Sequence, residues 1–331
     1  MRGNKTDLKN DFSNVFRISY GVACALLIVI GTFGNIVIPL IVKRNKRLRN
    51  RTYFWLVNLS VADLLICSVC LPITFTNTVV SLDWVLGEVG CKITSYIIHV
   101  SFSVSALTLL AISWDRFLAV VFPLKLSSLT AGETGRTTYA ILAAIWIFAS
   151  ATMTPIANVH SVKIKLNSDG KTSKICKDSW SNPDFEKYYW VFLFVCYGLV
   201  IILMIILYCA IGNVLFSRKI IAEEITITSN RRLAHLRSRT KTIKMLCIIV
   251  VLFIVLWSPY FVLKILKVLK SDKNTKISSK AFAATSMLGI INSLCNFVIY
   301  AAMNKVFRDG VKQLFTRRKK VFPIPLQNVG L

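Results

Sequence analysis

Seven long apolar runs constrain this chain more than any other feature of its sequence. A helix needs about 20 mostly apolar residues to cross the roughly 30 Å hydrocarbon core of a bilayer. Runs of that length lie at about 17–43, 53–80, 90–121, 137–157, 187–216, 242–268 and 279–303. Because backbone groups that face lipid must be hydrogen-bonded within their own segment, each run is predicted to be a helix. The predicted fold class is an all-α membrane protein, a seven-transmembrane helix bundle.

Composition and charge distribution argue against a soluble protein and against a nucleic-acid partner. Of 331 residues, 55% are hydrophobic and 17% are charged, whereas soluble domains carry about a quarter charged residues. The net charge of +26 taken alone points to nucleic acid. The basic residues, however, lie in short clusters between apolar runs, as they do in membrane-flanking loops. We also expect no cleavable signal peptide, because residues 1–15 are polar and the first apolar run is too long.

Basic residues near the ends of the runs predict the orientation of the chain. The link between the first two runs carries six of them and no acid: Lys43, Arg44, Lys46, Arg47, Arg49 and Arg51. Such links face the cytoplasm, which makes 1–16 an extracellular tail, 17–303 the membrane domain, 304–316 an amphipathic helix and 317–331 a cytoplasmic tail. Lysines between 264 and 280 make the bias incomplete. Asn4-Lys5-Thr6 is a glycosylation acceptor on the outer tail, although Asn50-Arg51-Thr52 matches the same pattern on the inner side.

Two of the nine cysteines are expected to form a disulfide. Seven lie inside apolar runs, where cysteine usually behaves as a small hydrophobe. Cys91 and Cys176 lie on the oxidising outer side, where one bridge is expected. Residues 162–166 alternate in polarity before Asn167-Ser168-Asp169-Gly170, which predicts a β-hairpin lid. The alternative is a disordered polar loop.

Polar side chains inside the apolar runs are candidates for functional sites. Asp63 lies in the middle of the second run, where a carboxylate costs several kcal/mol unless it faces a partner or a watery cavity. Five further polar residues are available to meet it, and such oxygen ligands suit a small hard cation or a proton: Asn35, Ser105, Asn292, Ser293 and Asn296. The alternative is a neutral Asp63 that only holds helices together. The adjacent pair Asp115-Arg116 ends the third run, where it is either a switch or an interface anchor.

Many motifs in order resemble the rhodopsin-like, class A family of G-protein-coupled receptors, and most closely its neuropeptide-receptor branch. The resemblance covers all seven runs and the short helix after them. The matched residues are Gly34-Asn35, Leu59-Ser60-Val61-Ala62-Asp63, Trp84-x-x-Gly87 before Cys91, Asp115-Arg116-Phe117 with Pro123-Leu124, Trp146, Phe253-x-x-x-Trp257-x-Pro259 and Asn292-Ser293-x-x-Asn296-x-x-x-Tyr300. Together these motifs make a chance match negligible.

The resemblance implies roles for the matched positions. Arg116, released from Asp115 on activation, would face a heterotrimeric G protein, and Leu124 would fill an apolar socket on it. Tyr208 and Tyr300 would hold Arg116 through water, and Trp257, four residues after Phe253, would form the pocket floor. Pro259 would supply the kink about which the sixth helix moves outward. An allosteric sodium ion would be held by Asp63, Ser105, Asn292 and Asn296. The resemblance further implies arrestin as a partner, a plasma-membrane location and no enzymatic activity or other cofactor.

Several residues depart from the family pattern. Phe117 replaces the usual Tyr, Leu256 replaces Cys, and the prolines usual in the fifth and seventh helices are replaced by Val200 and Phe297. Without those prolines we expect more complete helical hydrogen bonding and weaker kinks. Arg239 stands where an acid would face Arg116, so we expect raised basal signalling, with Asp115 still available to hold Arg116.

A peptide is the ligand class that the sequence favours. The position at which amine receptors place Asp holds Ile98, and the retinal-lysine position holds Ile290. A hairpin lid, a rim of lysines and an aromatic wall of Tyr188, Tyr189, Trp190 and Tyr260 suit a polar chain ligand. Lys264 is expected either to meet a ligand carboxylate or to reach water. The predicted pocket residues are Ile98, His99, Trp190, Trp257, Tyr260, Lys264, Phe282 and Ser286. The alternatives are a receptor for a small anionic lipid or organic acid, a non-coupling decoy receptor, and a secondary transporter for ions or solutes.

Overall fold

The computed structural model describes residues 4–44, 51–80, 83–122, 134–166, 172–224, 230–269 and 279–315. Seven segments of these residues are helical and apolar enough to cross a membrane, and they lie close to the predicted runs: Asn14–Arg44, Arg51–Phe75, Gly87–Val121, Arg136–Val159, Pro183–Ser217, Thr240–Leu269 and Ala281–Met303. The predicted seven-helix membrane fold is therefore confirmed.

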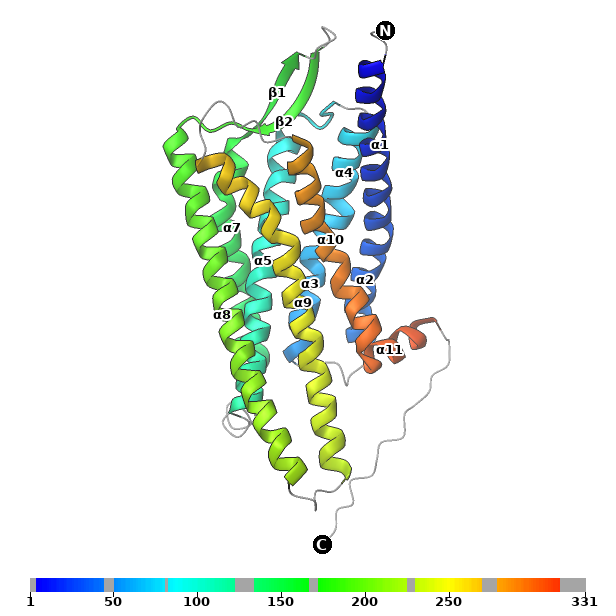
Figure 1. Cartoon of the computed structure of the whole chain (residues 1–331), viewed down its shortest axis with the longest axis vertical. Helices are drawn as coiled ribbons and strands as arrows, with labels where there is room; N and C mark the ends of the chain where they lie inside the picture. The colour runs from blue at the N-terminus through cyan, green and yellow to red at the C-terminus, as the bar shows by residue number, and fades with distance from the viewer. Residues whose placement is uncertain are drawn as a thin grey trace.

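The helices run alternately up and down through one bundle, which is capped at one end by a hairpin (Figure 1). Their bounds in chain order are α1 Asn4–Leu26, α2 Thr32–Arg44, α3 Arg51–Leu65, α4 Leu71–Phe75, α5 Gly87–Val121, α7 Thr134–Val159, α8 Pro183–Glu224, α9 Asn230–Leu269, α10 Ser279–Met303 and α11 Lys305–Phe315. Helix α1 begins at Asn4, so the predicted outer tail is largely a helical extension of the first span, while the side chain of Asn4 lies outside the described residues.

Three short π-helical turns, two within the first two spans and one directly after the second, were not predicted by the hydropathy pattern. They are Leu27–Gly31, Ile66–Cys70 and Thr76–Val80. Two of them flank Pro72, whose nitrogen donates no hydrogen bond and whose ring crowds the carbonyl of Ser68 four residues earlier. The local hydrogen-bonding pattern therefore changes around this residue, as it does at many π-bulges.

Helices α8 and α10, in which Val200 and Phe297 replace the usual prolines, are uninterrupted. Helix α9 contains Pro259 and changes direction in its outer part (Figure 1). This contrast agrees with the expectation that helices without proline are straighter, because proline removes a backbone hydrogen bond.

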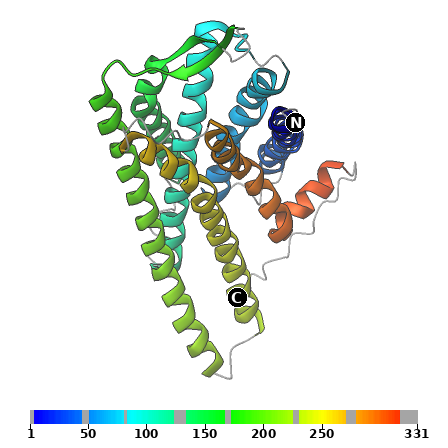
Figure 2. The same cartoon turned by 45° about the horizontal axis from the view of Figure 1, so that its top comes forward.

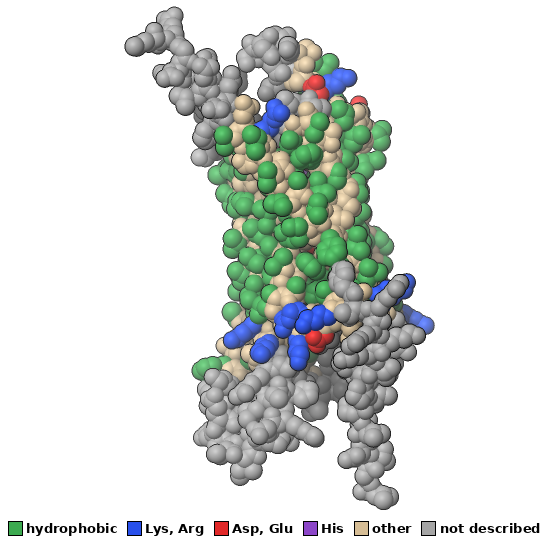
Figure 3. All heavy atoms as spheres, turned by 90° about the vertical axis from the view of Figure 1, so that its right-hand side faces the viewer, with side chains coloured by type: hydrophobic (Ala, Val, Ile, Leu, Met, Phe, Trp, Pro, Cys, Tyr) green, Lys and Arg blue, Asp and Glu red, His purple; other side chains and the backbone are tan. Residues whose placement is uncertain are grey.

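The outer surface of the bundle is apolar, as a surface in contact with lipid must be. Exposed side chains include Val29 and Ile147, which are 68% and 69% exposed. Figure 3 shows a continuous hydrophobic band whose edge, at the end where α11 lies, carries clustered Lys and Arg side chains. Helix α11 has a strongly apolar side, on which Phe307 is buried against the bundle. This arrangement matches the predicted amphipathic eighth helix.

The predicted hairpin lid is present. Strands β1 (His160–Leu166) and β2 (Thr172–Asp178) are antiparallel, with Val162 opposite Cys176. Figure 2 shows the hairpin crossing the outer end of the bundle. The predicted turn at 167–170 lies outside the described residues.

Candidate functional site

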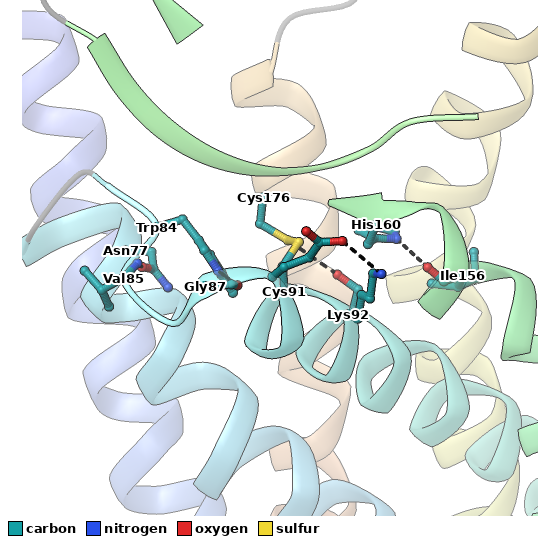
Figure 4. Close-up of a disulfide and its surroundings, with 11 residues drawn as sticks. Asn77, Trp84, Val85, Gly87, Cys91, Lys92, Ile156, His160 and Cys176 are labelled. Carbon is teal, nitrogen blue, oxygen red and sulfur yellow. Dashed lines mark hydrogen bonds and ion pairs between the residues drawn. A yellow bond between two sulfur atoms is a disulfide. The ribbon is translucent and has the colours of Figure 1, made fainter. Parts of the chain in front are cut away.

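A disulfide fixes the hairpin to the start of α5. Cys91 and Cys176 are bonded, as predicted, and their Cα atoms lie 5.6 Å apart. Figure 4 shows this bond beside Trp84, whose indole nitrogen donates to the Gly87 carbonyl at 2.6 Å. Gly87 has a φ of +64°, a conformation that favours glycine. The Trp84-x-x-Gly87 motif thus shapes the turn that delivers Cys91 to the hairpin.

The preceding loop is also bonded to the hairpin, a connection that the sequence did not reveal. The Trp84 amide donates to the Lys174 carbonyl, and the Lys174 amide donates to Asp83 Oδ1, both at 2.8 Å. Together with the disulfide, these bonds hold β2 over the outer end of α5.

A buried ion pair joins this lid to helix α9. Lys264 Nζ lies 2.9 Å from Asp178 Oδ2, and the two side chains are only 10% and 12% exposed. The Lys264 ammonium also lies 4.4 Å from the ring centroid of Trp190. Burial by itself would raise the pKa of Asp178, but the charges of Lys264 and Lys267 hold that pKa well below its usual range. Lys264 therefore already has a carboxylate partner within the protein.

His99 lies beneath this pair. Its Nδ1 is 2.8 Å from the Ser95 carbonyl, and its Nε2 is 3.3 Å from the Tyr260 hydroxyl. The His99 ring is also 6.1 Å from that of Trp190. His99 therefore lines a cavity and is also hydrogen-bonded between α5 and α9.

The predicted aromatic wall is wrong for two of its four members. Tyr188 is 72% exposed, and the hydroxyl of buried Tyr189 donates to the Thr152 carbonyl on α7 at 3.0 Å. A helix turns by about 100° per residue, so three consecutive residues cannot face one pocket. Trp190 and Tyr260 remain beside Lys264 and His99, and the ring centroid of Phe282 lies 5.9 Å from Lys264 Nζ. Ile98 and Ser286, two other predicted members, are half-buried.

Trp257 lies at the base of this region, as expected, and packs against two residues that the sequence analysis missed. Its ring centroid is 4.5 Å from that of Phe102 on α5. A Cβ atom added at Gly289 on α10 would lie 2.8 Å from the Trp257 ring. Phe102 also stacks on Phe253 at 5.7 Å, so it connects the pocket floor to the middle of α9.

Asp63 lies in a buried polar cluster. It is 1% exposed, and the Asn296 amide donates to its Oδ2 at 2.8 Å. Ser105 and Asn292 are also buried. Within the described part of the chain, the Oδ1 atoms of Asn292 and Asn296 are buried without a hydrogen-bond donor. Buried acceptors are normally satisfied. The Asp63 carboxylate and the two orphaned amide oxygens, which lie one helical turn apart on α10, are therefore a donor set that fits a hard cation.

A second buried polar link connects three spans. Asn58 donates to the Thr108 hydroxyl and accepts from the Trp146 indole, both at 2.8 Å. This accounts for Trp146 in the motif pattern, whereas the sequence offered no signal for Thr108.

Asp115 is shared by two cations at the inner end of the bundle. Its Oδ2 lies 2.9 Å from Arg116, and its Oδ1 lies 3.4 Å from Nε of Arg51 on α3. Asp115 is 8% exposed, and the two arginines are 21% and 22% exposed. The predicted Asp115–Arg116 pair therefore exists, and Arg51 is a third member that the sequence analysis had treated only as part of a basic link.

The remaining predicted coupling residues are placed as follows. Tyr208 packs with Val120, Ile211 and Ile243 beside the inner ends of α5, α8 and α9. Tyr300 is 1% exposed, and its hydroxyl has no hydrogen-bond partner among the described residues. Leu124 and the side chain of Arg239 lie outside the described residues.

Seven spanning helices, an outer pocket under a disulfide-held lid and an inner arginine cluster define a membrane receptor. The chain belongs to the rhodopsin family, since the model of "7 transmembrane receptor (rhodopsin family)" matches residues 34–300. Members of this family are receptors and not enzymes, and this assignment replaces the secondary-transporter alternative.

Individual relatives are peptide receptors by name. The chain is 33% identical to neuropeptide FF receptor 2 of Rattus norvegicus over 93% of this chain and 74% of that protein. It is 26% identical to the pyroglutamylated RF-amide peptide receptor of the same species, over 89% and 69%. Identity to the RYamide receptor of Drosophila melanogaster is 29%, over 92% and 65%.

Proposed function

We propose that the protein is a plasma-membrane receptor, with its N-terminus outside the cell, for an extracellular peptide that ends in arginine, an aromatic residue and an amide. The relatives named for RF-amide and RYamide peptides support this ligand class. The observation that carries the proposal is the buried carboxylate of Asp178, which is fixed over the pocket beside aromatic side chains.

Asp178 is suited to a guanidinium. The disulfide and the strand pairing hold the Asp178 backbone opposite His160, and its current partner is a lysine. A ligand arginine forms two parallel hydrogen bonds to a carboxylate, whereas a lysine makes a single point contact. The arriving arginine therefore replaces Lys264, which keeps its contact with the Trp190 ring. An amidated ligand end is neutral and needs no cation, so Lys264 is free to pair with Asp178 in the receptor without ligand.

The test pairs receptor variants with peptide variants. An Arg-Phe-amide peptide and its citrulline analogue, which is neutral at the arginine position, are titrated against the wild type, Asp178→Asn and Asp184→Asn. Asp184 is an exposed acid in the first turn of α8 and serves as the matched control. A hydrogen bond to a charged group contributes about 1.5–3 kcal/mol, so citrulline is expected to weaken binding by roughly 10- to 150-fold.

The pattern across the variants decides the outcome. The citrulline penalty should be present in the wild type and in Asp184→Asn, and absent in Asp178→Asn. A penalty that persists in Asp178→Asn would contradict the assignment of Asp178. Binding of fatty or other organic acids in place of peptides would favour the anionic-ligand alternative.

The signalling half of the proposal is activation of a heterotrimeric G protein by outward movement of α9 about Pro259. The inner cluster supports it, because the acid that holds Arg116 is also engaged by Arg51. In this proposal Arg116 is held through water by Tyr208 and Tyr300 after activation, and Leu124 fills an apolar socket on the G protein. Arrestin is proposed as a second cytoplasmic partner. Basal nucleotide exchange on purified G protein should be lost in Arg116→Ala. Ligand binding without exchange in either protein would identify a decoy receptor.

Sodium is proposed as an allosteric ion at Asp63, with Ser105, Asn292 and Asn296 as further ligands. The orphaned Oδ1 atoms of Asn292 and Asn296 support this assignment. The bound ion would supply positive charge that offsets the buried carboxylate and so would stabilise the resting arrangement of α3 and α10.

A further inference from the structure

A cavity of about 260 Å³ lies among α5, α7 and α8, beside the predicted peptide pocket, with which it shares His99 and Trp190. Three of the side chains that line it, Phe148, Phe192 and Leu199, are 54%, 52% and 53% exposed. They belong to the spans Arg136–Val159 and Pro183–Ser217. The cavity therefore reaches the surface that faces hydrocarbon, and molecules dissolved in the bilayer are the ones that can enter it.

The wall of the cavity selects an uncharged, slender occupant. No lysine, arginine, aspartate or glutamate is found among the described residues that line it, and the small side chains of Ser103 and Ala106 provide depth on the α5 side. Its volume lies below the roughly 300–1,000 Å³ that is usual for drug-sized ligands. A single flexible hydrocarbon chain fits these limits better than a fused ring system.

We propose that this cavity binds one fatty acyl chain of a bilayer lipid, which enters between α7 and α8. The inner end of the chain contacts Phe102 and Phe261, which line the cavity. Phe102 packs 4.5 Å from Trp257, and Phe261 stacks 4.5 Å from Tyr197. The bound chain fills the space behind the residues that support Trp257 and stabilises their packing.

Photolabelling of the full chain in nanodiscs tests this site without any peptide ligand, so its result is independent of the proposed function. The probe is phosphatidylcholine with a photoactivatable group in the middle of one acyl chain, and a photoactivatable sterol is the comparison. Labelled residues are located by mass spectrometry. Label on Ser103 or Ala106 is diagnostic, because both side chains face the interior, whereas any surrounding lipid labels Phe192.

Matched variants provide the control. Val200→Phe fills the cavity from α8, and Val195→Phe makes the same change on a side chain of α8 that is 51% exposed and does not line the cavity. We expect labelling of the α5 wall in the wild type and in Val195→Phe, and loss of that label in Val200→Phe. Added phospholipid should also raise the unfolding temperature of the delipidated receptor in the first two proteins but not in Val200→Phe.

Two results would overturn the proposal. One is label confined to outward-facing residues in the wild-type receptor, which needs no variant to interpret. The other is labelling of the α5 wall by the sterol probe and not by the acyl probe.

Discussion

Replacing Gly34 with alanine should destabilise the receptor, because Phe297 occupies the space beside it. A Cβ atom at position 34 would lie 2.5, 2.7 and 2.9 Å from Cγ, Cδ1 and Cβ of Phe297, well inside the ordinary contact range of 3.4–4 Å. Rotation of the ring cannot relieve a clash with Cβ, so α2 and α10 must move apart. This contact involves the phenylalanine that replaces the usual proline after Asn296.

The magnitude follows from two opposing effects. Overpacking of a helix contact costs about 1–3 kcal/mol, and replacing glycine with alanine in a helix returns up to about 1 kcal/mol. We therefore expect Gly34→Ala to lower the free energy of unfolding by about 1–2 kcal/mol. The movement would also strain the hydrogen bond from the Asn35 amide to the Ser293 carbonyl, now 2.9 Å.

A double-mutant cycle with Phe297→Ala measures this contact. With the ring removed, only the 2.9 Å contact with Cβ of residue 297 remains. The same glycine replacement should then be close to neutral, because this remaining overpacking roughly offsets the helix-propensity gain of alanine. The expected coupling energy is therefore about 1–2 kcal/mol. Denaturant titration of the purified receptor in mixed micelles provides the free energies.

The control for this cycle is Gly212→Ala on α8, where nothing lies within 4 Å of the added Cβ. This variant should be neutral or slightly stabilised. Equal effects of Gly34→Ala with and without the Phe297 ring would refute the reasoning, because the clash would then contribute nothing.

Three other perturbations have defined outcomes. In Arg51→Gln, Asp115 would pair with Arg116 alone and hold it more firmly in the resting state. A partly exposed ion pair contributes about 0.2–1 kcal/mol, so basal nucleotide exchange should fall by up to about fivefold. Unchanged exchange would show that Arg51 takes no part in the switch. Asp63→Asn should abolish the reduction of agonist affinity by sodium at constant ionic strength, and a persisting sodium effect would place the ion elsewhere. Burial lowers the pKa of His160, so its contribution to hairpin stability is complete above about pH 6.5 and is lost as the pH falls through its lower folded-state pKa. Once the slower intrinsic exchange at low pH is divided out, hairpin amides should be less protected at pH 5 than at pH 7 in the wild type, and His160→Gln should remove that part of the difference.

The sequence alone determined the properties that depend on local composition. The seven spans were predictable because a run of apolar residues must become a helix to cross a bilayer. The pairing of Cys91 with Cys176 was predictable because the other cysteines lie in spans. The hairpin followed from the alternation before Asp169-Gly170, since a two-residue period reports on a strand without any knowledge of its partner.

Only the tertiary structure decided which helix faces meet. The ion pair of Lys264 with Asp178 joins residues 86 positions apart, and neither residue carries a local signal for the other. The same holds for Arg51 with Asp115 and for Trp257 with Gly289. The misplaced aromatic wall shows the reason, because hydropathy measures how apolar a span is but does not determine how the helix is rotated. That rotation is set by close packing between helices, which brings together residues that the sequence keeps far apart.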